Sequence, residues 1–349
     1  MSILVTGGAG FIGANFVLDW LTQHDEPVIN LDKLTYAGNR TNLAAVEAEP
    51  EQAARFAFVR GDIADASLVA PLVAEADAVI NVAAETHVDR SILDPEAFLR
   101  TGVIGVHVLL EAVRMERDRA AKGERPRAPR FLQVSTDEVY GNVPTGHSKE
   151  TDQLAPRSPY AASKAGGDLM VLAYRTTYNL PVMITRGSNN IGPYQFPEKV
   201  VPVFVTNAID NVPLPIYGNG GALRDYIYVT DHCAGIDTVL RKGEPGEVYN
   251  VGGGNETNTI VLAKAILSRL GKPESLMTFV PDRPGHDMRY AVDCSKLRAL
   301  GWELDYTFEA SLNATVDWYV NNQDWWRPLK SGEYREYYAR NYGNRAALI

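Results

Sequence analysis

The sequence predicts an α/β fold in which a doubly wound parallel sheet is joined to a smaller C-terminal α/β lobe. Short apolar runs alternate with helical patterns through the first half of the chain, and a glycine-rich loop follows the first run. Strands separated by helices favour a parallel sheet with helices on both faces, and near-continuous apolar runs fit a sheet buried on both sides. After Arg186, proline and glycine become frequent and the strands shorten. This change indicates the second, smaller lobe.

The expected elements follow one another in a regular order. Apolar runs predict the first strands at residues 3–5, 28–32, 56–59, 78–82 and 131–134. Helical periodicity covers residues 11–21, and long helices are predicted over 95–119 and 159–178. We expect residues 1–190 to form the larger domain, with some later segments interleaved, and residues 191–349 to form mainly the smaller lobe.

Composition limits the classes of function. The 349 residues are 45% hydrophobic, which allows a sizeable core, and they carry a formal net charge of −9. An acidic balance without a basic stripe argues against nucleic-acid binding. Cys233 and Cys294 show no metal-ligand spacing, so we expect buried free thiols in a reducing compartment and no metal site. Met1 leads almost directly into a strand-like run and no apolar run approaches the ~18 residues of a membrane span, so we expect a soluble, cytoplasmic protein.

A glycine-rich loop lies between the first predicted strand and the first helix. Gly7, Gly10 and Gly13 allow a tight turn that brings backbone N–H groups to a pyrophosphate at the helix N-terminus. Asp32 ends the second strand about 20 residues later, where a carboxylate accepts hydrogen bonds from the adenosine ribose and repels a 2′-phosphate. The larger domain is therefore predicted to be a Rossmann-type domain that binds NAD rather than NADP. Asp62, after the third strand, is either an adenine contact or a helix N-cap.

Tyr160 and Lys164 form a Tyr-x-x-x-Lys pair on the second long helix. Their i, i+4 spacing places both side chains on one helix face. A nearby ammonium lowers the pKa of a phenol, which is ordinarily about 10. We therefore expect Tyr160 to act as a base toward a sugar hydroxyl, with Ser135 or Thr136 as its hydroxyl partner. Outside a dinucleotide fold, the same pair would be a chance occurrence on a helix.

Asp137 and Glu138 follow the strand at 131–134 directly. The carboxyl ends of strands in open α/β sheets face the ligand crevice. Dehydrogenation needs the tyrosine and a hydroxyl, so an added acid and base indicate a second proton-transfer task. The alternative is a helix-capping Asp137 with a solvated Glu138.

These motifs resemble those of the extended short-chain dehydrogenase/reductases, and among them the nucleotide-sugar 4,6-dehydratases. The segments that carry the resemblance reach from the first strand to about Asp293. They are 7–13, 83–91, 135–141, 158–168, 189–190, 196–199, 215–218, 224–226 and 282–286.

The resemblance implies a redox-neutral dehydration of dTDP-glucose to dTDP-4-keto-6-deoxyglucose, with NAD as the cofactor. Tyr160 would remove the proton of the C4 hydroxyl while hydride passes from C4 to NAD, with Lys164 holding the nicotinamide ribose. Thr136 would hold the C4 hydroxyl. Glu138 would take the C5 proton, and Asp137 would protonate the departing C6 hydroxyl. The hydride then returns to C6, so NAD is regenerated in place.

The resemblance also implies two sets of binding residues and a homodimer formed by the helices at 95–119 and 159–178. The cofactor set is Gly7, Gly10, Phe11, Ile12, Gly13, Asp32, Lys33, Leu34, Thr35, Asp62, Ile63, Ala83, Ala84, Thr101, Tyr160, Lys164 and Asn190. The nucleotide-sugar set is Thr86, Thr136, Asn189, Glu198, Lys199, Val200, Pro215, Ile216, Tyr217, Arg224, Asn258, Asp282, Arg283, His286 and Tyr290.

Some features depart from the family pattern. Gly187 stands where related chains often have Cys, Ala or Thr, and Ile191 stands where they often have Tyr. Both border the Asn189-Asn190 segment and concern sugar or base selectivity. The connection at 141–158 is shorter than in some relatives. His87 and His232 show no metal spacing and are expected to be structural or to support the binding residues.

Two rival functions remain open at this point. A UDP-sugar 4-epimerase or decarboxylase on the same scaffold would use Tyr160 and Lys164 but would leave Asp137 and Glu138 without a task. A non-catalytic NAD-sensing protein would show a broken Tyr-x-x-x-Lys pair, and the pair is intact.

Overall fold

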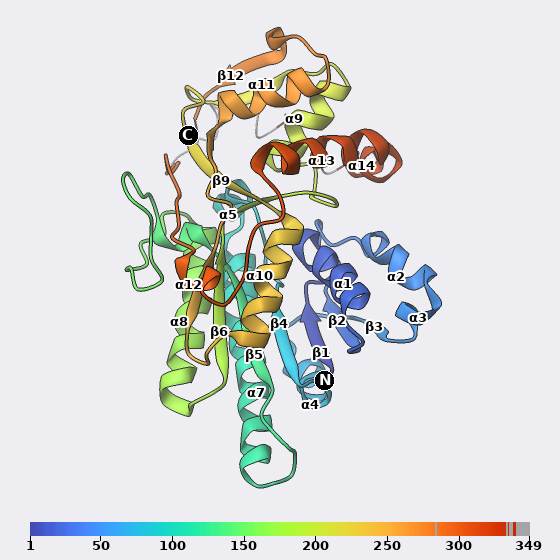
Figure 1. The fold of residues 1–349 in the computed structure, drawn as a ribbon, viewed down its shortest axis with the longest axis vertical. Coiled ribbons are helices and arrows are strands. Elements are labelled where there is room, and N and C mark those ends of the chain that lie inside the picture. The colour runs from blue at the N-terminus through green and yellow to red at the C-terminus, as the bar shows by residue number, and fades with distance from the viewer. Residues whose placement is uncertain (283–284, 333, 335–337, 340–349) are drawn as a thin grey trace.

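The computed structural model describes residues 1–282, 285–332, 334 and 338–339. Within these residues, the largest element is a parallel sheet of seven strands in the order β10-β6-β5-β4-β1-β2-β3 (Figure 1). The strands are β1 (Ile3–Thr6), β2 (Val28–Asp32), β3 (Phe56–Arg60), β4 (Ala78–Asn81), β5 (Arg130–Thr136), β6 (Val182–Gly187) and β10 (Val248–Val251). The expected doubly wound α/β fold is confirmed. The strand order changes direction between β1 and β4, and such a point opens a crevice at the carboxyl ends of the strands.

Helices cover both faces of this sheet. They are α1 (Phe11–Gln23) and α10 (Val229–Lys242) on one face, and α4 (Ala66–Glu75), α7 (Val106–Ala121) and α8 (Pro159–Tyr178) on the other. Strand β1 shows why both faces are apolar: Ile3 and Val5 belong to the first core cluster, whereas Leu4 belongs to the second. Successive side chains of a strand point to opposite faces, so a sheet covered on both sides needs a continuous apolar run.

The long helix expected at 95–119 is divided into three parts. It consists of α6 (Pro95–Leu99), a wider π-helical turn (Arg100–Gly105) and α7. Glycines in the turn allow very close packing: a Cβ on Gly102 would lie 3.1 Å from Ser163 Oγ of α8, and one on Gly105 would lie 2.5 Å from Ile63 Cδ1. The widened turn contains Thr101, which lines the cofactor cleft described below. The helix expected at 159–178 is present as α8.

A second lobe lies beyond the carboxyl ends of the large sheet (Figure 1). Its strands are β7 (Asn189–Ile191), β9 (Leu223–Tyr228) and β11 (Glu256–Asn258) in one sheet, and β8 (Leu214–Tyr217) and β12 (Met277–Val280) in another. Its helices are α9 (Val200–Ile209), α11 (Thr259–Arg269), α13 (Phe308–Asn321) and α14 (Gln323–Leu329). They enclose a separate core around Phe204, Ile266 and Tyr319. Between these elements the chain returns to the large sheet through α10 and β10.

Short helices complete the description. They are Arg40–Leu43, α2 (Ala44–Ala48), α3 (Pro50–Ala53), α5 (Val88–Leu93), Asp137–Tyr140, Glu274–Leu276 and α12 (Ser295–Arg298).

Cys233 and Cys294 are buried free thiols, as expected. In the part of the chain that the structure describes, no helix has the length and apolar character to cross a membrane, and no group of His, Cys, Asp and Glu side chains could hold a metal ion.

Candidate active site

The glycine loop forms the floor of a cleft at the carboxyl end of β1. Gly7 has a φ of +73°, and a Cβ there would lie 2.7 Å from Ala83 Cα. A Cβ on Gly13 would collide with the carbonyl of Gly7. Gly10 precedes α1 and supplies no capping side chain, so the first N–H groups of this helix are not taken by a side-chain cap. The loop therefore offers a helix N-terminus to an anionic group, as the glycine spacing predicts.

Asp32 stands at the end of β2 and lines the same cleft. Its Oδ2 accepts a hydrogen bond from the Ala9 N–H at 2.8 Å, and its Oδ1 accepts one from the Leu34 N–H at 2.8 Å. Burial raises the pKa of Asp32, and these two N–H groups oppose the rise. Each carboxylate oxygen has lone pairs beyond one hydrogen bond, so the group can still accept from ribose hydroxyls.

Asp62 is not the N-cap of the helix that follows it. Asp65 has that place, because its side chain accepts hydrogen bonds from Ser67 N and Leu68 N at the start of α4. Asp62 instead forms an ion pair with Lys33 at 2.9 Å and lines the cleft. The alternative that made Asp62 a helix cap is therefore wrong.

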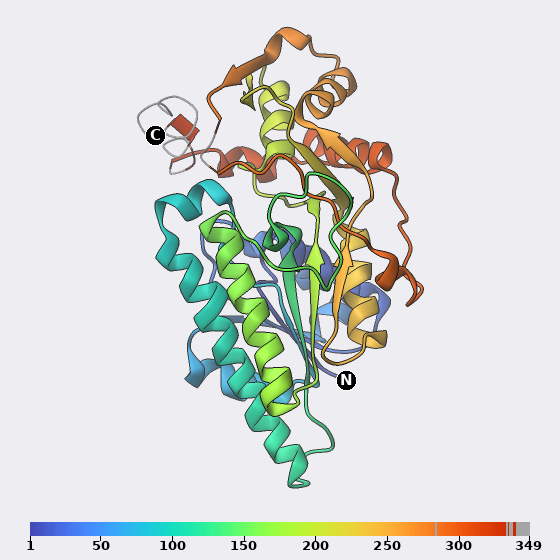
Figure 2. The same ribbon diagram turned by 90° about the vertical axis from the view of Figure 1, so that its left-hand side faces the viewer.

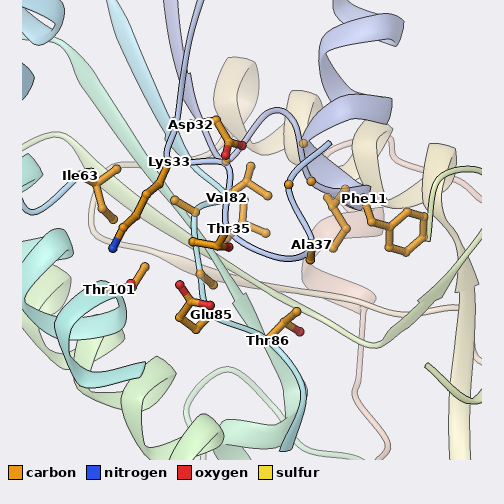
Figure 3. Close-up of a pocket in the computed structure, with 18 of the residues that line it drawn as sticks. Phe11, Asp32, Lys33, Thr35, Ala37, Ile63, Val82, Glu85, Thr86 and Thr101 are labelled. Atoms are coloured by element: carbon orange, nitrogen blue, oxygen red, sulfur yellow. The ribbon is translucent and has the colours of Figure 1, made fainter. Parts of the chain in front are cut away.

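Most of the expected cofactor set surrounds this cleft, which we call the cofactor cleft (Figure 3). The lining members are Gly7, Gly10, Phe11, Ile12, Gly13, Asp32, Lys33, Thr35, Asp62, Ile63, Ala83, Ala84, Thr101, Tyr160 and Lys164. Leu34 and Asn190 do not line it. The amide of Asn190 is engaged within the protein, since Nδ2 donates to Ser188 O at 3.0 Å and Oδ1 lies 2.9 Å from His232 Nδ1.

Several lining residues were not in the expected set. They include Ala37, Gly38, Val82, Glu85, Ser135, Gln195 and Phe196. Val82, Glu85 and Ser135 directly neighbour expected residues at strand ends, so position after a strand is a signal that could have found them. Gln195 and Phe196 come from the second lobe and carry no such local signal.

Tyr160 and Lys164 lie on α8, which begins after the N-cap Ser158. Lys164 is buried, and its Nζ donates to Val134 O of β5 at 2.7 Å. Burial lowers the pKa of Lys164 to about 8. The pKa of Tyr160 lies above its ordinary value, chiefly through burial and then through the charge of Glu138, while a hydrogen bond with Thr136 opposes the rise. The structure thus corrects the expectation of a phenol pKa already lowered by Lys164, because burial is the largest influence on the pKa of Tyr160.

Thr136, Asp137 and Glu138 occupy the end of β5 and the short helix after it. Thr136 Oγ1 donates to Asp137 Oδ1 at 3.2 Å and accepts from Glu138 N at 3.3 Å, so the helix cap is Thr136. Asp137 is buried, with 3% of its surface exposed. Burial, together with Glu138 and Asp225, holds the pKa of Asp137 well above its ordinary value. The reading of Asp137 as a helix cap is therefore wrong, and the raised pKa favours the protonated form of this carboxyl.

A second cleft, the substrate cleft, adjoins the first. Tyr160 and Lys199 line both clefts, so the two meet at these residues. Expected members of the nucleotide-sugar set that line it are Asn189, Glu198, Lys199, Val200, Pro215, Tyr217, Arg224, His286 and Tyr290. Glu138 also lines it, whereas Asp137 lies buried behind. Lining residues outside the expected sets include His87, Val88, Asp89, Val203, Phe204, Ala222, Tyr226 and Thr259.

The remaining members of the nucleotide-sugar set lie elsewhere. Thr86 lines the cofactor cleft and accepts a hydrogen bond from Lys199 Nζ at 2.9 Å. Ile216 is fully buried in the core of the second lobe. Asn258 caps α11, because its Oδ1 accepts from Val261 N at 2.8 Å. Asp282 Oδ1 lies 2.7 Å from His286 Nδ1.

Arg283 lies outside the described residues. Thr136 caps the short helix Asp137–Tyr140, as described above. Arg224 lines the substrate cleft, and its Nη2 donates a hydrogen bond to Asp287 O at 2.8 Å.

Comparisons with known proteins agree with this arrangement. A family profile described as GDP-mannose 4,6 dehydratase matches residues 4–315. The chain is 52% identical over 345 residues to a dTDP-glucose 4,6-dehydratase of Xanthomonas campestris pv. campestris, covering 95% of this chain and 97% of that protein. The chain belongs to the dTDP-glucose 4,6-dehydratase family.

Solved structures of dehydratases and of epimerases share the fold. The dTDP-glucose 4,6-dehydratase of Streptomyces venezuelae, solved with NAD and TYD bound, has a TM-score of 0.88 and 47% identity over 95% of this chain and all of its own. The UDP-glucose 4-epimerase of Thermus thermophilus, solved with NAD, has a TM-score of 0.81 and 32% identity over 92% of this chain and all of its own. The scaffold alone therefore does not separate dehydratase from epimerase.

Gly187, one of the two departures from the family pattern, has a structural explanation. A Cβ on Gly187 would lie 2.8 Å from both Cε1 and Nε2 of His232. His232 is buried, its pKa is lowered to about 4 by burial, and its Nδ1 lies beside Asn190 Oδ1. Gly187 thus makes room for a neutral imidazole next to the Asn189-Asn190 segment. Ile191 is buried in the core of the second lobe.

Proposed function

We propose that this chain converts dTDP-glucose to dTDP-4-keto-6-deoxyglucose in a redox-neutral reaction. The observation that carries the proposal is the junction of the two clefts, where Tyr160 stands beside Glu138 with Asp137 behind it. An epimerase or a decarboxylase needs the tyrosine but leaves this acid and base unused. Two relatives named dTDP-glucose 4,6-dehydratase, which are 52% and 45% identical to this chain, support the same reaction.

The residues of the cofactor cleft fit NAD. The glycine loop and the start of α1 would hold the pyrophosphate, Asp32 would accept the adenosine ribose hydroxyls, and Lys164 would hold the nicotinamide ribose. The Asp32 carboxylate disfavours the 2′-phosphate of NADP. When bound, NAD supplies the acceptor for hydride from C4 and later the donor of hydride to C6.

The first proton transfer belongs to Thr136 and Tyr160. Thr136 would orient the C4 hydroxyl, and Tyr160 would take its proton at the phenol oxygen. Because burial raises the pKa of Tyr160, the phenolate requires a nearby cation. Lys164, one helical turn further along α8, is the cation in place for this task.

The second set of proton transfers belongs to Glu138 and Asp137. Oxidation at C4 acidifies C5, and Glu138 faces the substrate cleft where it would take that proton. Burial raises the pKa of Asp137 and so favours its protonated form, which would protonate the leaving C6 hydroxyl. Asp137 Oδ2 is buried without a hydrogen-bond partner among the described residues, and a substrate hydroxyl would satisfy it. Glu138 would then return a proton to C5.

The substrate cleft would hold the nucleotide diphosphate. Arg224 and Lys199 would bind the phosphates, since a guanidinium matches phosphate oxygens in a bidentate geometry. Pro215 and Tyr217 would pack on the base, and His286 would contact the diphosphate or its ribose. Residues 1–190, with α10 and β10, would thus form the NAD-binding domain, and the remainder of 191–349 mainly the nucleotide-sugar lobe.

Proton NMR of the protein with dTDP-glucose in deuterated water tests the proposed reaction. We expect a new C6 methyl signal, deuterium at C5 and no net NADH. A C4 epimer, or carbon dioxide released from a UDP-sugar acid, without a methyl signal would show an epimerase or decarboxylase instead.

The proposed assembly is a homodimer built on one face of the large domain. Helices α7 and α8 run side by side there (Figure 2). Large apolar side chains are exposed on these two helices and on the segment that leads into α7. They are Leu99 of α6, Ile104 of the π-helical turn, Met115 of α7, and Leu169 and Tyr178 of α8. Such a stripe on paired helices is suited to an isologous contact with a second copy. Sedimentation should give a dimer for the wild type and a monomer for Leu169→Glu.

We also propose a cytoplasmic location. The support is chemical: Cys233 and Cys294 are both free thiols, and free thiols are usual in a reducing compartment. Fractionation of cells that express the chain, with immunodetection, would test the location. Recovery of the protein from an oxidising compartment would contradict it.

A further inference from the structure

A cluster of three side chains joins the walls of the two clefts, and the proposed reaction gives it no task. Tyr36 lies between Thr35 and Ala37, which line the cofactor cleft. Its hydroxyl lies 2.6 Å from Glu198 Oε1 and 3.0 Å from the carbonyl of Thr86. A phenol has one proton to donate, and the carboxylate is the closer and charged acceptor. Tyr36 therefore reaches from the cofactor loop to Glu198 in the wall of the substrate cleft.

Arg90 completes the cluster. Its Nε donates to Glu198 Oε2 at 2.7 Å, and its guanidinium carbon lies 3.6 Å from the centre of the Tyr36 ring. The Glu198 side chain is 0% exposed. A buried carboxylate is costly unless donors satisfy it, so Glu198 depends on both Tyr36 and Arg90. We call these three side chains the Tyr36 clasp.

The clasp connects segments that face the same cofactor cleft. Thr35 and Ala37 line that cleft from the loop after β2, while Phe196 and Lys199 line it from the second lobe. Phe196 also contacts the Tyr36 ring edge to face, with ring centres 5.4 Å apart. The bond from Tyr36 to Glu198 thus ties the loop beside the adenosine end of the cleft to the wall that the substrate would contact.

We infer that Tyr36 is a positioning residue that keeps NAD in its cleft between the two hydride transfers. The inference rests on the proposed function, in which hydride taken from C4 must return to C6 of the same sugar. Loss of the cofactor between these transfers leaves two products: NADH, which carries the two electrons and the hydrogen from C4, and a sugar nucleotide with a 4-ketone. A clasp across the cleft wall opposes this loss.

Tyr36→Phe tests the clasp because it removes the hydroxyl and keeps the ring. Calorimetric titration with NAD alone should show an affinity up to about 10-fold weaker, because the loop that lines the cleft is no longer held in place before NAD binds. During turnover of dTDP-glucose, fluorescence of the filtrate should reveal free NADH that accumulates with the variant and not with the wild type. Tyr306→Phe, which removes a hydroxyl on a side chain 37% exposed and outside both clefts, is the matched control and should behave as the wild type.

Other outcomes separate the clasp from the proposed function. If Tyr36→Phe binds NAD as tightly as the wild type and releases no NADH, the clasp is overturned while the reaction stands. If the wild type forms no C6 methyl, the proposed reaction itself has failed. Arg90→Gln provides a second variant, since loss of its bond to Glu198 should weaken NAD affinity in the same direction. Unchanged affinity in Arg90→Gln would also count against the clasp.

Discussion

The cofactor cleft and the substrate cleft are built in different ways. The cofactor cleft is lined chiefly by residues at or just after the ends of strands of one parallel sheet, such as Asp32 at the end of β2 and Ala83 after β4. The substrate cleft draws on loops, helices and short strands from residue 87 to residue 290, brought together by the fold of the second lobe. A parallel sheet aligns the carboxyl ends of its strands, so local motifs reveal the first cleft. No comparable rule aligns the parts of the second.

Both clefts hold charges of both signs. Asp32, Asp62 and Lys164 line the cofactor cleft, whereas Glu138, Glu198 and Arg224 line the substrate cleft. The junction between them contains Tyr160 beside Glu138, with the buried Asp137 behind. In the proposed function, binding is divided between the two clefts and proton transfer takes place where they meet.

Tyr160→Phe should have the largest effect, because Tyr160 belongs to both clefts. Without the phenol oxygen, the C4 hydroxyl has no base, so turnover should fall by about 100- to 10,000-fold. Affinity for NAD and for dTDP should change little, as measured by calorimetry. Turnover at the wild-type rate would remove Tyr160 from the mechanism.

Exchanging one charge in each cleft should separate the two binding tasks. Asp32→Asn should weaken NAD binding by about 10-fold or more, because the amide is a poorer acceptor for ribose hydroxyls. Arg224→Gln should weaken dTDP binding by a similar factor. Each variant should leave the other ligand's affinity unchanged in separate titrations. Equal losses of both ligands in either variant would break the division between the clefts.

The pH dependence should report Lys164. In the proposed mechanism, the charged ammonium of Lys164 stabilises the Tyr160 phenolate. The pKa of Lys164 is about 8, so kcat/KM should decline as pH rises through that value. Lys164→Arg should move the alkaline limb to higher pH, because a guanidinium stays protonated there. An alkaline limb that does not move in this variant would assign it to another group.

Of these substitutions, Gly187→Ala should have the smallest effect, and that effect should be on the stability of the folded protein. Its Cβ would press on the buried ring of His232, so the free energy of unfolding should fall by about 1–3 kcal/mol in urea titrations. In the His232→Ala background the same change should cost much less, because the ring is gone. An equal cost in both backgrounds would contradict the steric explanation.

The sequence predicted the fold and the cofactor cleft well for identifiable reasons. Glycine spacing, a carboxylate at a strand end and apolar runs each have one structural meaning, and Gly7 and Asp32 lie where they indicate. The environment of Asp137 was not predictable, since burial among Glu138 and Asp225 depends on tertiary packing. The same holds for the raised pKa of Tyr160.

The substrate cleft was predicted less completely. Val203 and Phe204 line it without a motif of their own, because their places depend on how α9 packs against β8. Asn258 was expected at the substrate but caps a helix, a role that its position before α11 equally allows. Among the described residues, Tyr36 and Glu198 meet across 162 positions of sequence, which no local pattern records.

The central claim is that hydride removed from C4 returns to C6 of the same molecule at one site. The most direct measurement uses dTDP-glucose deuterated at C4, mixed with an equal amount of undeuterated substrate that carries carbon-13 throughout the sugar. Mass spectrometry of the product should place deuterium in the C6 methyl of the carbon-12 molecules and none in the carbon-13 molecules. Deuterium that remains at C4, or that appears in the carbon-13 product, would contradict the account.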